Sequence, residues 1–339
     1  MESELPELQK FINNHWENNH IMATSKKLMD WQHYDKDNKI YNFVIAKHNK
    51  TKKIHAILGF FPTSHFDNSI QHIDIALAIW KIREDIKVAG LGLSLMNYLV
   101  SKKRPRILYG SGVNPKVIPI YKFMGYEIGV MNHYYIVNER KTDFQLIGNF
   151  NGRYNNEKII SGDKTILVRY ERSDYINSSE KITNFISELR LPAKSHNYLY
   201  HRYFCHPVYD YHIYGLRNKN CTIGFAVFRL CSYDSNYALR MVDYFGYDDG
   251  LSGISGELQR LLQDYDAEYI DFYNIGIDEE ILFTSGFIKR DSECEVIIPN
   301  YFEPFDKKSV ELTYTYKCNN NLNFSICKAD SDQDRPNMI

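Results

Sequence analysis

The chain has 339 residues, lacks any long apolar run, and carries charges that almost cancel. No hydrophobic stretch approaches the roughly 20 residues that a membrane-spanning helix needs, and residues 1–6 do not have the pattern of a signal peptide. With 41 Lys and Arg against 42 Asp and Glu, the formal net charge is −1. The sequence therefore offers no overall basic field for nucleic acid or a membrane surface, and it predicts a cytoplasmic protein.

Cysteine is also scarce and unevenly placed. There are six cysteines, none of them before Cys205, and no CxxC pair occurs. Scattered free thiols of this kind are typical of a reducing compartment. His201 and His206 have no carboxylate or thiol at ligand spacing beside them, so no metal site is predicted.

The order of the expected elements repeats once along the chain. Each half reads as a helix or strand, a β-hairpin, a strand, a helix, a strand and a short helix, with apolar residues at strand or helix spacing. A polar, glycine-containing stretch around residues 148–162 separates the halves. A chain of this length favours two domains. We predict an α/β (α+β) protein with tandem units at residues 1–145 and 146–339, each a mixed, mostly antiparallel sheet flanked by helices.

Residues 73–126 organise the first half. They read as a buried strand, a glycine turn, a helix, a second strand, and a helix that ends at Gly125. Gly90 and Gly92 let the turn approach a ligand closely. Because the N-terminus of the next helix presents free N–H groups and a positive dipole end, a phosphate group is the expected guest.

The strand at 73–80 has two faces by alternation. Ile73, Ile75, Leu77 and Ile79 are expected in the core. The other parity, which includes Asp74 and Trp80, either faces a ligand or is further core. Further along, residues 126–137 read as one long or bulged strand.

Two motifs carry a resemblance to a known family. Residues 87–92, Lys-Val-Ala-Gly-Leu-Gly, match the pattern (Arg/Gln)-x-x-Gly-x-(Gly/Ala), with Lys87 in place of Arg or Gln. Asn114, Tyr121 and Gly125-Tyr126 match an Asn…Tyr-x-x-x-Gly-(Phe/Tyr) segment. Together and in this order, they resemble the GNAT acyl-CoA N-acyltransferases.

The whole chain is similar to the two-domain GNAT enzymes that acylate dTDP-linked amino-dideoxyhexoses, in particular the dTDP-3-amino-3,6-dideoxygalactose N-acyltransferases. The stretches that carry this likeness are residues 31–33, 57–62, 131–135, 202–207, 269–273 and 332–337. The resemblance implies transfer of an acetyl or 3-hydroxybutyryl group from acyl-CoA to the sugar amine, in bacterial O-antigen, lipopolysaccharide or capsule biosynthesis. In the second half, the loop at 248–253 has two carboxylates where a phosphate would bind, so we expect that half to have lost CoA and to help hold the acceptor.

The resemblance also implies the residues that hold coenzyme A. In this family the pantetheine arm pairs with the backbone of the buried strand like an added strand. The implied cofactor-binding residues are Ile79, Ile82, Lys87, Val88, Ala89, Gly90, Leu91, Gly92, Leu93, Asn114, Tyr121 and Lys122.

Three residues are candidates for proton transfer. Tyr121 is either the acid that protonates the departing thiolate, as the family implies, or a core tyrosine. The base that deprotonates the acceptor amine is Asp74, His133 or a water chain toward either. No cysteine lies in the CoA half, which favours direct attack in a ternary complex over an acyl-enzyme.

The acceptor site is expected to use aromatic and cationic side chains. A thymine ring stacks on aromatics and a diphosphate binds Arg, although an aromatic inter-domain core explains the same composition. The tail at 330–337 is either a disordered end or folds back beside the sugar nucleotide. The candidate substrate-binding residues are Trp80, His133, Arg202, Tyr203, His206, Tyr209, Tyr211, Asp271, Tyr273 and Arg335.

Two alternatives stay open. One is a GNAT enzyme acting on another small amine, and the other is a non-catalytic protein that binds CoA or a sugar nucleotide. The sequence does not predict the oligomeric state.

Overall fold

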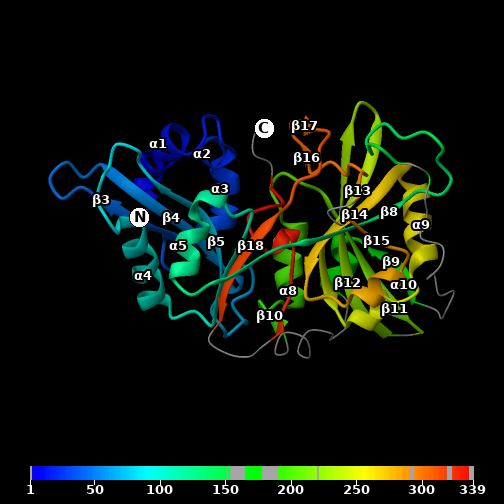
Figure 1. The fold of residues 1–339 in the computed structure, drawn as a ribbon. Helices are drawn as coiled ribbons and strands as arrows, with labels where there is room; N and C mark the ends of the chain where they lie inside the picture. Colours follow the sequence, from blue (N-terminus) through cyan, green and yellow to red (C-terminus); the bar gives the residue numbers. More distant parts are fainter. Residues whose placement is uncertain are drawn as a thin grey trace.

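A computed structural model describes residues 2–150, 152, 165–177, 190–219, 221–290, 294–318 and 323–335. These residues form two units, each built on one large mixed sheet with helices packed against it (Figure 1). The expected mixed sheets flanked by helices are confirmed. The sequence also predicts a helix at residues 179–189, from a Ser-x-Glu start, and this segment lies outside the described residues. Across the described ranges, no helix is both long and apolar enough to cross a membrane.

The first unit has a six-stranded sheet in the order β3-β4-β5-β6-β18-β7. Its strands are β3 (Phe43–Lys47), β4 (Ile54–Pro62), β5 (Asp74–Ile82), β6 (Ile107–Ser111), β18 (Thr313–Cys318) and β7 (Glu127–Val130). Its helices are α1 (Leu5–His15), α2 (Ile21–Thr24), α3 (Lys26–His33), α4 (Leu91–Lys103) and α5 (Ile118–Phe123). Helix α1 forms because its apolar residues recur at helical spacing and bury one face.

The second unit has an eight-stranded sheet in the order β15-β8-β14-β13-β12-β11-β9, with β20 paired to β14. Its strands are β15 (Ile288–Arg290), β8 (Asn132–Val137), β14 (Ala267–Ile275), β13 (Asn236–Gly246), β12 (Cys221–Tyr233), β11 (Tyr211–Asn218), β9 (Thr165–Tyr170) and β20 (Ile326–Cys327). Its helices are α6 (Arg172–Asn177), α8 (His196–Leu199), α9 (Ser255–Asp264) and α10 (Glu279–Thr284).

Three short ribbons complete the described structure. They pair β1 (Tyr34–Asp35) with β2 (Ile40–Tyr41), β10 (Arg190–Leu191) with β19 (Asn323–Phe324), and β16 (Tyr301–Phe302) with β17 (Phe305–Asp306). The first and third are antiparallel and the second is parallel.

The two units exchange strands. We predicted one long strand over residues 126–137, and this was wrong: β7 pairs with β18 in the first sheet, whereas β8 pairs with β14 and β15 in the second. The chain changes sheets at Met131, whose N–H donates to the carbonyl of Leu312. In return, β18 from near the C-terminus stands among the blue and cyan strands of the first unit (Figure 1). Two strands thus cross the predicted division at residues 145 and 146.

Strands β5 and β6 pair over only three residue pairs and then part. The pairs run in parallel from Asp74–Ile107 to Ala76–Tyr109, while β5 continues to Ile82. Beyond Ala76, the edge of β5 that faced β6 therefore has no strand beside it among the described residues. Backbone N–H and C=O groups left in this way are available to an extended ligand.

A β-bulge lies where β5 leaves β6. Leu58 pairs with Trp80 and Phe60 with Leu77, so two residues of β5, Ala78 and Ile79, oppose the single residue between them on β4. Such a bulge shifts the alternation of side chains by one position. Trp80 consequently packs in the same apolar cluster as Leu77, whereas Ile79 packs beneath the N-terminal helices. The predicted two-face parity of this strand is therefore wrong beyond Ala78.

The second sheet has a matching gap where β13 and β14 part, and another strand of the chain fills it. β13 and β14 pair in parallel as far as Met241–Phe272. Beyond that point β20 pairs with Asn274 and Ile275 of β14, of which Asn274 also pairs with Asn132 of β8. β20 contacts β13 as well. The C-terminal segment thus occupies the opening.

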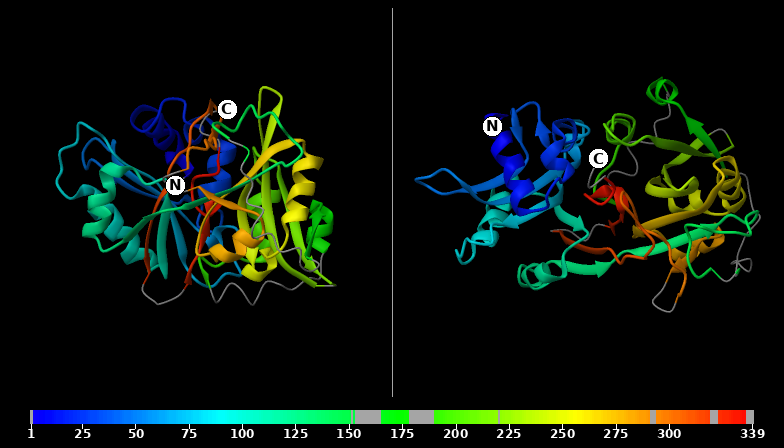
Figure 2. Two further views of the ribbon diagram at one scale, coloured as in Figure 1. Left: turned by 45° about the vertical axis from the view of Figure 1, so that its right-hand side comes forward. Right: turned by 90° about the horizontal axis from the view of Figure 1, so that it is seen from above.

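The C-terminal segment continues through the 3₁₀ turn η6 (Lys328–Asp330) and lies between the two units (Figure 2). Asp330 and Asp334 are buried, and the Lys194 ammonium donates to Asp330 at 2.7 Å and to Asp243 at 2.5 Å. As far as residue 335 the tail is folded back against the chain, so a disordered end is wrong there, and its place beside a sugar nucleotide stays a prediction. Residues 336 and 337 lie outside the described ranges.

Candidate active site

A groove opens where α4 begins. Gly90 is the N-cap of α4 and has a φ of 73°, a left-handed conformation that favours glycine. A Cβ at Gly90 would meet nothing within 4 Å, so the backbone there faces open space. The helix runs for 13 residues, and its first turn points N–H groups into this space. The arrangement suits a phosphate group.

This groove, which we call the cofactor groove, has a volume of about 550 Å³ and a mostly apolar lining. One wall is β5 and the loop before α4, and the other is α5 with the turn that precedes it. The lining residues are Trp80, Lys81, Ile82, Val88, Gly90, Leu91, Gly92, Leu93, Val117, Pro119, Ile120 and Phe123.

A second opening, the acceptor cavity, adjoins the same strand at the residues just before Trp80. It has a volume of about 380 Å³ and is bounded by Leu77, Ala78 and Ile79 of β5, by the end of β6 and by residues of the second unit. Trp80, the next residue of β5, lines the cofactor groove. The bulge of β5 therefore stands between the two spaces.

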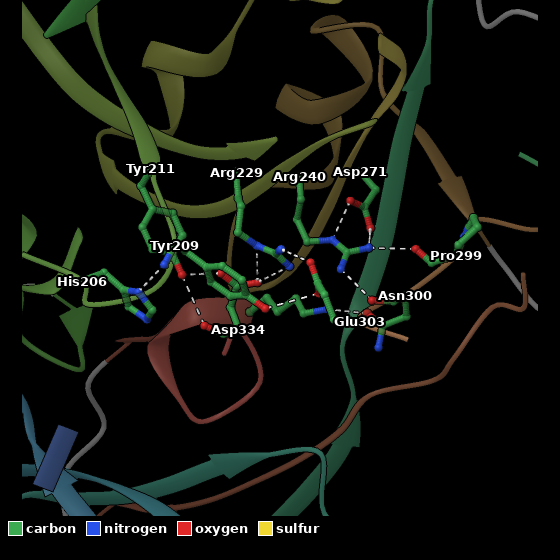
Figure 3. Close-up of polar contacts among 11 residues, drawn as sticks. His206, Tyr209, Tyr211, Arg229, Arg240, Asp271, Pro299, Asn300, Glu303 and Asp334 are labelled. Carbon is green, nitrogen blue, oxygen red and sulfur yellow. Dashed lines mark hydrogen bonds and ion pairs between the residues drawn. The ribbon is translucent and has the colours of Figure 1, made fainter. Parts of the chain in front are cut away.

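The second unit lines the acceptor cavity with paired cations. Arg229 bonds to Asp334 at 3.2 Å and its guanidinium lies 4.1 Å from the ring centre of Tyr209. Arg240 bonds to Asp271 at 2.9 Å and donates to the carbonyls of Pro299 and Asn300 (Figure 3). Because both guanidinium groups are held by several partners, this wall is preorganised.

No protein-family model matches the chain. No curated protein matches it. Solved structures do match. A GCN5-related N-acetyltransferase from Anabaena variabilis superposes with a TM-score of 0.53 at 10% sequence identity, over 94% of this chain and 71% of that one. One from Kribbella flavida gives a TM-score of 0.54 at 11% identity, over 94% and 69%.

The chain has the fold of the GCN5-related N-acetyltransferases. At 10% and 11% identity this likeness shows the fold alone. The roles of the site residues therefore rest on the geometry of this chain.

In this GNAT fold, six of the predicted cofactor-binding residues line the cofactor groove: Ile82, Val88, Gly90, Leu91, Gly92 and Leu93. Lys87 and Ala89 belong to the same exposed loop, and Lys122 is exposed on α5. Ile79 and Asn114 instead line the acceptor cavity. Trp80, which we predicted to bind the substrate, lines the cofactor groove instead. The bulge in β5 exchanges the places that Ile79 and Trp80 would have in a regular strand.

The prediction missed the α5 wall. Ile120 and Phe123 are 38% and 82% exposed, and they line the groove together with Val117 and Pro119. The helical spacing of Val117, Ile120, Tyr121 and Met124 predicts a buried stripe, and Pro119 within it predicts a kink, but Ile120 is exposed. Pro119 lies in the first turn of α5, where a proline is tolerated. Apolar residues at 117, 120 and 123, three apart, were the available signal.

Tyr121 is buried at 5% exposure between two aromatic rings. Its ring centre is 5.5 Å from Trp80 and 5.1 Å from Tyr126, both edge-on. Burial raises the pKa of the Tyr121 phenol, so the hydroxyl keeps its proton at neutral pH. The position adjoins the groove through Trp80.

His133 and Asp74, the two candidate bases, have structural partners. His133 Nε2 lies 3.0 Å from Asp271, and its ring stacks on Tyr273 at 3.7 Å. Burial lowers the pKa of His133. Asp74 is fully buried, accepts from Arg106 Nε at 2.8 Å, and also accepts from the backbone N–H of Ala193 at 2.7 Å. Both geometries resemble those of fixed internal pairs more than those of groups that reach a substrate.

Of the predicted substrate-binding residues, Tyr209 and Arg335 line the acceptor cavity. Three others support that wall from behind: Tyr211 donates to Asp334 at 2.7 Å, His206 Nδ1 accepts from the Tyr209 N–H at 2.8 Å, and Asp271 holds Arg240.

Of the remaining three, Tyr273 stacks on His133 and donates to the carbonyl of Val310 at 2.8 Å, and the other two anchor the chain. Arg202 donates to the carbonyls of Ala329 and Ser331 at 2.8 and 3.1 Å, and Tyr203 donates to Asp243 at 2.5 Å. Arg202 therefore binds the segment that carries Lys328 and Asp332, and it is not itself among the residues that line the acceptor cavity.

Proposed function

We propose that this protein is an N-acyltransferase that moves an acyl group from acyl-CoA to an amine held in the acceptor cavity. The observation that carries the proposal is the parting of β5 from β6 at Ala76, between a phosphate-compatible helix N-terminus and a polar cavity. An acyl-CoA laid along the bare edge of β5 would have its diphosphate at Gly90 and its thioester near the bulge.

The chemistry then needs no covalent enzyme intermediate. The amine attacks the thioester carbonyl directly, and a backbone N–H at the bulge of β5 stabilises the oxyanion. Tyr121 protonates the departing thiolate, since a buried phenol with a raised pKa keeps a proton to give. Holding both substrates at adjoining positions along one strand favours the reaction by proximity.

For the acceptor we propose a dTDP-linked amino-dideoxyhexose, with acetyl or 3-hydroxybutyryl as the acyl group, in O-antigen, lipopolysaccharide or capsule biosynthesis. The resemblance of the whole sequence supports this choice. The acceptor cavity combines an aromatic ring, Tyr209, with Arg229 and Arg335, which suits a base and a diphosphate.

The test is a panel assay. Acetyl-CoA is supplied with dTDP-3-amino-3,6-dideoxygalactose, the same sugar without the nucleotide, and simple amines, and free thiol is measured. We expect the nucleotide sugar to give the highest kcat/KM. A faster simple amine would replace the sugar proposal with another acceptor, and CoA binding without any turnover would leave a binding protein.

A matched pair of variants tests the position of CoA. Gly90→Asp places a carboxylate where the diphosphate is proposed, and Gly125→Asp makes the same change at a glycine with the same φ of 73° outside the groove. Left-handed strain is of order 1–2 kcal/mol in both. We expect Gly90→Asp to weaken CoA binding by at least about tenfold, from charge repulsion, and Gly125→Asp to bind normally. Equal affinities would contradict the proposed position.

A further inference from the structure

One cation of the acceptor cavity differs from the rest. Arg229, Arg240 and Arg335 are each paired with a carboxylate, at 3.2, 2.9 and 2.6 Å. Lys328 also lines the cavity and is only 2% exposed. Among the described residues its ammonium nitrogen donates to the amide oxygen of Asn300 and has no carboxylate within ion-pair distance.

The surroundings of Lys328 disfavour a positive charge. Its side chain is buried, which opposes the charge, although the Tyr273 ring centre 5.4 Å from the nitrogen favours it. Four charged groups face it from three strands and the tail: Arg229 from β12 and Arg240 from β13 oppose its charge, and Asp271 from β14 and Asp334 from the C-terminal segment favour it. Burial is the largest effect and, with Arg240, lowers the pKa of Lys328 to about 7.

The position of Lys328 is fixed by the strand that precedes it. Lys328 directly follows β20, the strand that closes the opening of the second sheet. It therefore stands on a fixed turn, and it lines the same cavity as Leu77, Ala78 and Ile79 of the first unit. An acceptor amine that reaches the thioester at the bulge of β5 enters this cavity.

We propose that Lys328 is the base of the acyl transfer, taking a proton from the acceptor ammonium inside the acceptor cavity. This inference rests on the proposed N-acyl transfer. The neutral Lys328 amine removes one proton from R–NH₃⁺, which becomes R–NH₂. The lone pair of the acceptor R–NH₂ then forms a bond to the thioester carbonyl carbon, and the C–S bond breaks. The acceptor nitrogen loses a second proton, which balances the proton that the CoA thiolate takes up from Tyr121. Lys328 releases the proton it accepted to water.

Three exposed carboxylates line the cavity: Glu17, Glu303 and Glu311. Glu303 lies 3.6 Å from Arg229, so Glu17 and Glu311 are the rivals for this role. A carboxylate base and a lysine base differ in the pH at which activity appears. The neutral lysine is present only above its pKa, so kcat/KM rises as pH increases through about 7.

The test compares pH profiles of kcat/KM, with acetyl-CoA and the panel amine that reacts fastest. We expect Lys328→Met and Lys328→Arg to lose the rising limb near neutral pH and to fall on the order of 100-fold or more, while binding CoA normally. Asn300→Asp puts a carboxylate beside the ammonium and should move the limb to higher pH. A merely structural lysine would not produce that shift.

A readout that is independent of activity separates this inference from the proposed function. The ¹³C signal of the Lys328 Cε, assigned by its loss in Lys328→Arg, should titrate near pH 7 in the full-length protein. Titration of Lys328 in the ordinary lysine range overturns the assignment even if amines are acylated. The assignment is also overturned if the rising limb of the pH profile is lost in Glu311→Gln or Glu17→Gln but kept in Lys328→Met. If Lys328 titrates near 7 and no amine reacts, the acyl-transfer proposal fails and the base assignment fails with it.

Discussion

Tyr121 and Tyr126 are neighbouring buried tyrosines that contact each other, and only one of them contacts the Trp80 ring of the cofactor groove. Tyr126 directs its hydroxyl to the sulfur of Met96 at 3.6 Å, inside the core. We expect Tyr121→Phe to lower kcat by about 100-fold with CoA affinity nearly unchanged, because an acid acts only on the leaving thiolate.

Tyr126→Phe is the matched control and should keep kcat, because it loses the same atom away from the groove. Single-turnover measurements with saturating acetyl-CoA distinguish the two. A wild-type rate in Tyr121→Phe would make Tyr121 a core residue.

Asp74 offers a test between catalysis and structure. Its carboxylate is fully buried against Arg106, so Asp74→Asn leaves an uncompensated buried guanidinium and should lower the free energy of unfolding by about 3–5 kcal/mol. Lys26→Ala, which breaks the exposed pair with Asp30, should cost about 0–1 kcal/mol. Denaturant unfolding measures both. If Asp74→Asn stays fully stable and loses turnover, Asp74 is the base after all.

At the scale of elements, the exposed apolar face of α5 is a feature that the fold itself does not require. Phe123 is 82% exposed at the rim of the cofactor groove. Phe123→Ser should weaken CoA binding several-fold while changing stability by no more than about 0.5 kcal/mol, as is usual for surface positions. Tyr98→Ser on α4, another exposed aromatic outside the groove lining, should bind CoA normally. Calorimetric titration of both variants decides whether this face contacts the cofactor.

Local patterns in the sequence predicted local structure well. Strand β5, the glycine turn and α4 follow from an apolar run, two glycines and helical spacing, and they lie where expected. The pattern of alternation failed at Ala78, because a bulge depends on pairing with β4 and leaves no mark in the strand's own composition. The exchange of β7 and β8 between sheets was missed for the same reason, since only tertiary pairing separates them.

The candidate site likewise has one part that the sequence predicts and one part that it does not. The helix N-terminus that suits a phosphate comes from consecutive residues, which a motif can reveal. The acceptor cavity brings Arg229, Arg240, Asn300 and Lys328 together from β12, β13, the loop after residue 294 and the C-terminal segment. Side chains so far apart in sequence share no spacing, and no local signal identifies them.

At the scale of the whole molecule, the gap between β5 and β6 in the first sheet is open, whereas the gap between β13 and β14 in the second sheet is filled. Because β20 occupies the space between β13 and β14, we expect one CoA to bind per chain. Isothermal titration with CoA should give a stoichiometry of one, and Gly90→Asp should weaken this binding by at least about tenfold. Two equivalents, or binding that survives this substitution unchanged, would contradict the assignment.

The position of the last strands has a consequence for biosynthesis of the protein. β18 completes the first sheet, and the segment from β20 to Arg335 closes the second and supplies Lys328 and Arg335 to the acceptor cavity. The first sheet is therefore incomplete until β18 has been synthesised, and the gap in the second sheet stays open until β20 has been synthesised. A chain that stops before residue 313 lacks a strand of the first sheet and two cations of the acceptor cavity.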